Sequence, residues 1–223
     1  MRLTVRHNSC LGAQMNKLMI VVATMIILFA SAGATVVTSI PGGIVTPMPV
    51  LNVFGPGPQT FGAGITWSST NAVNQGGSVF GYNNSYSFAA NGSWVNNDMA
   101  GLNDSFLTFG VVDTMTFAFS TPVGAVGGFL NYAPGYGTPT IAVYDASNTL
   151  IESYVLTFLT GGGQNAGMFL GFQETTPIKY FTLSDAYIGI TNLTTQAVPE
   201  PSSLLMLGSG ILGLLGVARR KLK

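Results

Sequence analysis

Residues 114–120 read TMTFAFS, and this stretch decides the fold class. Its large apolar side chains, Met115, Phe117 and Phe119, recur at every second position, with small or polar residues between them. Successive side chains of a β-strand point to opposite faces, so the pattern predicts a strand with one buried face.

The chain that follows repeats this pattern. In residues 139–158, Ile141 and Val143 alternate with their neighbours, DASN at 145–148 makes a turn, and 150–158 returns, which predicts a β-hairpin. Further strands are expected at 123–132, 168–172, 178–183 and 187–193.

The chain before residue 114 is rich in turn residues. Prolines in 36–60 predict an extended lead-in or an edge strand, and Asn, Ser and Gly in 68–104 predict short strands and turns. No long segment between the ends shows helical periodicity. We therefore expect residues 35–197 to form a single antiparallel β-sandwich or jelly-roll-like ectodomain, an all-β fold.

Charge is scarce, and its placement excludes one class of function. Only 7% of the 223 residues are charged, against roughly 25% in ordinary domains. Residues 35–197 contain one base, Lys179, and seven acids, so their net charge is −6 (1 minus 7). Such a body cannot neutralise phosphates, so nucleic acid is excluded as a partner.

The N-terminal segment predicts export. Bases precede an apolar run of 13 residues, 18–30, and small residues follow it. This is the pattern of a signal peptide over residues 1–34, expected to form a helix, with cleavage after Ala32 or Ala34. Met15 offers a start that leaves a shorter leader than Met1. An uncleaved N-terminal anchor is the alternative.

The C-terminal segment predicts a membrane anchor. Pro199, Glu200 and Pro201 precede the apolar run 204–218, and a transmembrane helix is expected over 203–218. Arg219, Arg220 and Lys221 form a basic stop-transfer tail that stays cytoplasmic. The body therefore faces outward.

Residues 198–223 resemble a PEP-CTERM sorting signal. The resemblance rests on three elements in order, Pro199-Glu200-Pro201, a short Gly-interrupted apolar helix and the terminal base cluster. It implies a Gram-negative exopolysaccharide producer and an exosortase that processes the precursor near the motif. A plain tail anchor with an accidental Pro-Glu-Pro is the alternative.

The residues of the mature body limit its chemistry. His7 and Cys10, the only His and Cys of the chain, precede the expected cleavage site, so triads and zinc or thiolate sites are unavailable. We expect no enzyme. A hydrolase would need two carboxylates about 5–10 Å apart in a cleft.

Calcium is the one cofactor that the residues of the body could hold. Asp98, Asn103, Asp104 and Ser105 offer oxygen ligands in a loop, although Asx-rich turns explain the same residues. We expect no cofactor otherwise.

Two functions remain. The first is a non-enzymatic surface or matrix protein, exported through the inner membrane and associated with exopolysaccharide or biofilm. The second is a carbohydrate-binding module, with or without the assistance of calcium, in which Trp67, Trp94 or tyrosine rings stack on sugars. Exposed rings favour the second function, and buried rings favour the first.

Overall fold

The computed structural model of the protein describes residues 35–62, 64–71, 77–103 and 112–199. These residues form antiparallel β-structure with one short 3-10 helix. The elements in chain order are β1 (Thr35–Val37), β2 (Ile44–Thr46), β3 (Val53–Phe54), β4 (Gln59–Phe61), β5 (Ile65–Ser69), β6 (Ser78–Tyr82), β7 (Tyr86–Ser87), η1 (Ala89–Asn91), β8 (Ser93–Trp94), β9 (Met99–Leu102), β10 (Asp113–Tyr132), β11 (Thr140–Tyr144), β12 (Leu150–Val155), β13 (Met168–Asp185) and β14 (Ile188–Ala197).

Twelve of the strands belong to one hydrogen-bonded sheet. Its main path runs β12-β11-β13-β10-β14-β9-β6-β3, with β1 on β13, β2 on β14, β5 on β10 and β4 on β5. Strands β7 and β8 form a separate two-stranded ribbon. The expected antiparallel all-β architecture is confirmed.

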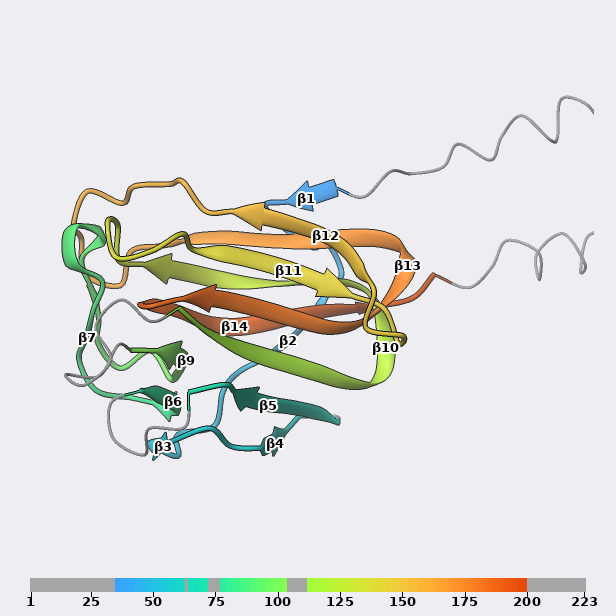
Figure 1. Cartoon of the computed structure of the whole chain (residues 1–223), viewed down its shortest axis with the longest axis horizontal. Helices are drawn as coiled ribbons and strands as arrows, with labels where there is room; N and C mark the ends of the chain where they lie inside the picture. Colours follow the sequence, from blue (N-terminus) through green and yellow to red (C-terminus); the bar gives the residue numbers. More distant parts are fainter. Residues whose placement is uncertain (1–34, 63, 72–76, 104–111, 200–223) are drawn as a thin grey trace, which may run out of the picture. The chain divides into compact units, whose positions relative to one another are not determined.

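The long strands β10 and β13 carry the sheet from one layer to another. They pair from Asp113↔Asp185 to Leu130↔Met168, and their register shifts between Ala118 and Ala125. At this break both strands change their outer partners. Strand β10 passes from β5 to β14, and β13 passes from β1 to β11. The sheet therefore bends at one corner, as Figure 1 shows for the two ribbons.

The two layers pack on a shared apolar core. Trp67 of β5 lies 5.2 Å from Phe80 of β6, and Phe172 lies 6.4 Å from Phe181 across the bend of β13, both between ring centroids. All four rings are fully buried. This packing is consistent with a β-sandwich. The face predicted from 114–120 is the core face, because Met115, Phe117 and Phe119 are at most 3% exposed.

Two pairs of predicted strands are continuous in the structure. Segment 123–132 continues the strand that begins at Asp113, and 168–172 and 178–183 are both parts of β13. Pro122 and Pro177 lie inside these continuous strands. They lie where the β10–β13 register shifts, and proline is tolerated at such irregularities because no ladder N–H is needed there. The predicted hairpin is β11 and β12, joined through the turn at 145–149.

The domain has two ends, which we name by their residues. The corner end contains the register break of β10 and β13. The described chain begins and finishes there, since Thr35 pairs with Gln173 and Ala197 pairs with Val123. The tyrosine end carries β7, β8 and the link between β13 and β14, and Figure 1 places β7 at the opposite side from the bend.

The predicted signal helix and the predicted transmembrane helix lie outside the described residues. Within the described part of the chain, no helix has the length and apolar character needed to cross a membrane.

Candidate functional site

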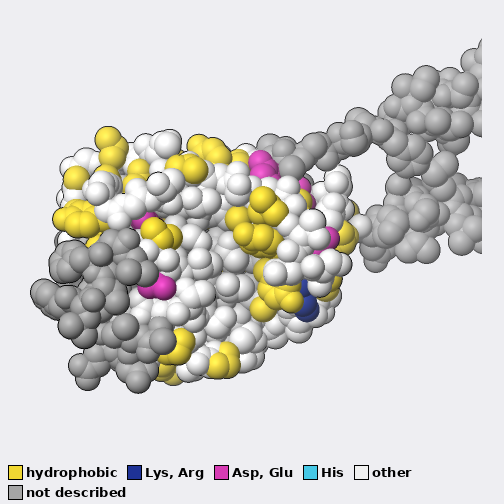
Figure 2. Space-filling view, in the orientation of Figure 1, with side chains coloured by type: hydrophobic (Ala, Val, Ile, Leu, Met, Phe, Trp, Pro, Cys, Tyr) yellow, Lys and Arg dark blue, Asp and Glu magenta, His cyan; other side chains and the backbone are white. Residues whose placement is uncertain are grey.

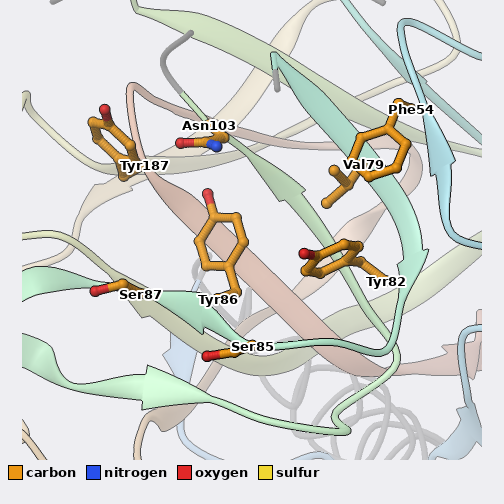
Figure 3. A pocket seen from close by; sticks show the side chains of 8 residues that line it. All are labelled: Phe54, Val79, Tyr82, Ser85, Tyr86, Ser87, Asn103 and Tyr187. Carbon is orange, nitrogen blue, oxygen red and sulfur yellow. The ribbon is translucent and has the colours of Figure 1, made fainter. Parts of the chain in front are cut away.

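A hollow at the tyrosine end gathers aromatic and polar side chains. The cavity has a volume of about 230 Å³. Its lining comes from five stretches of chain and consists of Phe54, Val79, Tyr82, Ser85, Tyr86, Ser87, Asn103 and Tyr187. Figure 3 shows Tyr86 between Phe54, Val79 and Tyr82 on one side and Asn103 and Tyr187 on the other.

Tyr86 fixes the floor of this hollow. It is only 7% exposed, and its hydroxyl donates a hydrogen bond to the backbone carbonyl of Leu102. Burial raises the pKa of Tyr86 well above its usual value, and the acidic groups of Tyr187 and Asp185 raise it further. The side chain is therefore a neutral phenol at physiological pH. Its ring also packs against Phe88 at 4.8 Å.

A second cavity of about 250 Å³ adjoins the first. It is lined by Ser87, Ala89, Ala133, Tyr136 and Tyr187, so the two cavities share Ser87 and Tyr187. Tyr136 and Tyr187 meet edge to face, with ring centroids 5.2 Å apart. Tyr136 is 48% exposed, which leaves much of its ring open to a ligand.

A buried carboxyl group lies behind the tyrosines. Asp185 is fully buried, and burial raises its pKa to about 6. The backbone N–H groups of Ala186 and Tyr187 offset part of this shift, although neither makes a hydrogen bond of good geometry. The backbone of Gly137 abuts Oδ1, since a Cβ on that glycine would lie 2.1 Å from it. Burial raises the pKa of Tyr132, and the nearby charge of Asp185 raises it further.

The described residues that line the two cavities carry no positive charge. Within the described residues the base Lys179 lies on β13, near the bend, and its Nζ donates to the carbonyl of Ser120. Figure 2 shows how thinly charge is spread over one face of the molecule. The site offers aromatic faces, hydroxyls and an amide, without a counter-ion for an anion.

The tryptophans do not form the sugar platform considered in the sequence analysis. Trp67 and Trp94 are both fully buried. Trp67 packs on Phe80, and the Trp94 indole Nε1–H donates to the carbonyl of Ala166 at 2.5 Å. Period-2 patterning places large rings on the inner face of a sheet, and the hydrophobic effect keeps them there.

The tyrosine site itself escaped sequence reasoning. Tyr82, Tyr86, Tyr136 and Tyr187 are spread over about a hundred residues. The one local signal was the alternation of tyrosine and serine in 82–87, YNNSYS, which reads as a turn-rich hairpin.

The expected calcium loop is described only in part. Asp98 and Asn103 are partly buried, while Asp104 and Ser105 lie outside the described residues. Asp98 has a positive φ of 45°, as residues of tight turns do. No group of three or more His, Cys, Asp or Glu side chains suited to a metal occurs in the described ranges. Calcium stays an untested prediction.

Two glutamates form a carboxyl pair outside the cavities. Glu174, on the irregular part of β13, is 7% exposed. Burial raises its pKa to about 7, and Glu152 of β12 adds to this by a side-chain hydrogen bond and by charge. Glu174 therefore keeps its proton up to about neutral pH. Neither glutamate is among the described residues that line the two cavities.

The residues predicted for sorting lie at or beyond the limit of the described chain. Pro199 is the last described residue, two positions after β14 ends. The remaining predicted residues are outside the described part, namely Ala32, Ala34, Glu200, Pro201, Arg219, Arg220 and Lys221.

Comparison with known families places the chain in a class of exported proteins. Residues 197–221 match the PEP-CTERM protein-sorting motif. The chain is thus a PEP-CTERM sorting-domain protein. The motif implies a membrane-anchored precursor that is exported and processed by exosortase. The match covers the C-terminal segment and leaves the β domain unassigned.

The other comparisons add little about the β domain. None of the curated proteins compared with the sequence matches it significantly. Among solved structures, a histidine mutant of the lectin-binding domain of lectinolysin, complexed with Lewis b, is similar at a TM-score of 0.32 and 9% identity. That match covers 45% of this chain and 72% of the other. A TM-score this low carries no argument about the fold, which therefore rests on the strand pairing described above.

Proposed function

We propose that this protein is a non-enzymatic component of the cell surface or extracellular matrix, delivered through the inner membrane and associated with exopolysaccharide. The observation that carries the proposal is the sorting motif at 197–221, which begins where the last strand, β14, ends. A β-sandwich that is followed directly by a sorting motif is the arrangement expected of a domain displayed outside the cell.

The make-up of the domain supports a binding or structural role over catalysis. The described residues that line the cavities at the tyrosine end are tyrosine, serine, asparagine and apolar residues, and among them is no acid, base or thiol nucleophile beyond the phenols. The buried tryptophans stabilise the core. Low charge and many hydroxyl and amide groups suit a protein embedded in a hydrated polymer.

The test follows the chain through export. We would insert an epitope into the exposed turn at 146–148, which is far from both termini in the sequence. The tagged full chain would be produced in an exopolysaccharide-forming Gram-negative host, with and without its exosortase. We expect the exosortase-positive cells to carry a surface form that lacks the segment after the motif. Mass spectrometry of both termini measures this and also locates signal cleavage.

Matched variants separate the motif from a general effect of sequence change. Replacing Pro199, Glu200 and Pro201 by alanine should leave the precursor at full length in the inner membrane. Glu152→Ala, which removes an acid of the β domain instead, should be processed like the wild type. Recovery of the uncut wild-type chain from the cytosol of exosortase-positive cells contradicts the proposal.

A further inference from the structure

We propose that the two adjoining cavities at the tyrosine end form one groove that binds a neutral polysaccharide chain. The inference rests on the proposed function, since it names how the exported protein would hold the polymer. It does not depend on the sorting step, because binding can be measured on the purified chain.

The shape of the site favours an extended ligand. The cavities measure about 230 and 250 Å³, each smaller than the roughly 300–1,000 Å³ of typical small-molecule pockets. They are joined through Ser87 and Tyr187, which belong to both linings. Two small hollows in a row match successive units of a chain better than one compact molecule.

The chemistry of the lining favours sugars. A pyranose ring presents an apolar C–H face and a rim of hydroxyls. Tyrosine offers the complementary pair, an apolar ring with a polar tip, and Tyr136 at 48% exposed is open for stacking. Ser85, Ser87 and Asn103 supply donors and acceptors at the edge of the first cavity.

The charges around the site favour a neutral polymer. Among the described residues, the lining contains no Lys, Arg or His. Asp185 lies behind it, fully buried, and becomes an anion above about pH 6. A uronic acid or a sulfated sugar would therefore meet repulsion without a compensating ion pair.

The position of the site suits an anchored protein. Both ends of the described chain leave from the corner end, where Thr35 pairs with Gln173 and Ala197 pairs with Val123. The cavities lie at the other end of the domain, where Figure 1 shows β7. The described lining of the groove therefore lies at the end of the domain opposite to the one where the described chain begins and finishes.

Affinity electrophoresis tests the proposal with defined polymers. The full chain, held in a polyoxyethylene detergent that carries no sugar, would be run through native gels. The gels would contain barley β-glucan, galactomannan or dextran as neutral probes, and alginate as the anionic probe. We expect retardation by at least one neutral polymer, and weaker or no retardation by alginate.

Two variants and one control assign the binding to the groove. Tyr136→Ala removes the exposed stacking ring, and Ser87→Trp fills the junction of the cavities from an exposed position. Each should weaken binding at least about tenfold. Tyr154→Ala is the matched control, because Tyr154 of β12 is 37% exposed and lines neither cavity. It should bind like the wild type.

Thermal melting first establishes that each variant is folded. Loss of retardation in either groove variant, with retention in the control, supports the proposal. The proposal is overturned if no neutral polymer retards the wild type, if alginate retards it more strongly, or if both groove variants bind normally. None of these results bears on processing by exosortase, so failure of the groove and failure of the export proposal remain distinguishable.

Discussion

The corner end and the tyrosine end of the β domain are closed in different ways. At the corner end, β10 and β13 pass from one layer to the other, so backbone ladders join the layers. At the tyrosine end, side chains make the connection. Asn131 Nδ2 donates to the carbonyls of Asn91 and Ala166, and Asn91 Oδ1 accepts from the backbone N–H of Thr160.

This difference explains where the cavities form. At the corner end Gly127 and Gly171 face each other so closely that a Cβ on Gly171 would lie 2.3 Å from the carbonyl oxygen of Val126. Side-chain closures leave hollows between loops, which a ligand can use. Each end also holds one buried acid, Asp185 or Glu174, and the variants below compare them.

The largest expected effect is the loss of the ring that holds the tyrosine end together. Trp94 packs with Phe88 and with Phe129, at 4.9 and 6.0 Å between ring centroids. We expect Trp94→Ala to lower the free energy of unfolding by about 3–5 kcal/mol, measured by urea titration. Trp94→Phe keeps a ring and loses the hydrogen bond to Ala166, so it should cost less. A cost below about 1 kcal/mol for Trp94→Ala would show that side chains do not close this end.

The second effect is a pH dependence that arises at the tyrosine end. The folded protein keeps the Asp185 carboxyl protonated up to about pH 6, whereas the unfolded chain releases that proton near 3.8. The free energy of unfolding should therefore fall by about 2–3 kcal/mol between pH 4 and pH 6. Asp185→Asn should remove this contribution to the slope and leave only the smaller one of Glu174, and it should resemble the wild type at pH 3. An unchanged slope in the variant refutes the assignment.

A smaller effect of the same sign is expected at the corner end. Folding raises the pKa of Glu174 from 4.5 to about 7, so stability should fall over that higher pH window. Because Glu152, the other member of the pair, is partly exposed to solvent, we expect Glu174→Gln to raise the free energy of unfolding at pH 8 by only about 1 kcal/mol.

Two further variants sharpen the comparison of the acids. Glu152→Gln should act like Glu174→Gln, because it relieves the same pair. The effects of Asp185→Asn and Glu174→Gln should add, since the two acids share no partner. Strong non-additivity in the double variant would contradict the separation of the two ends.

The smallest expected effect is that of Tyr136→Ala on stability. The side chain is half exposed and contacts Tyr187 edge to face. We expect a change within about 0.5 kcal/mol, measured by urea titration. A loss above about 2 kcal/mol would mean that Tyr136 belongs to the structural closure of the end and not to an open groove.

Much of the fold could be predicted from local pattern. The alternation of Met115, Phe117 and Phe119 fixed a buried face, and 139–158 gave the hairpin of β11 and β12. The continuity of β10 through Pro122 could not be predicted, because a proline reads as a break until the partner strand shows that no ladder bond is lost there. The exposure of the rings also escaped prediction, since aromatic residues follow the same pattern whether they lie in the core or on a rim.

The order of residues along the chain was sufficient for the strand pattern, the scarcity of charge and the sorting motif, because each is a local property that periodicity or a contiguous segment encodes. Three features were decided only by the folded domain. They are the gathering of Tyr82, Tyr86, Tyr136 and Tyr187, the burial of Trp67 and Trp94, and the pairing of Glu152 with Glu174. Those features depend on which strands become neighbours, and the bend of β10 and β13 sets that through contacts between residues far apart in the chain.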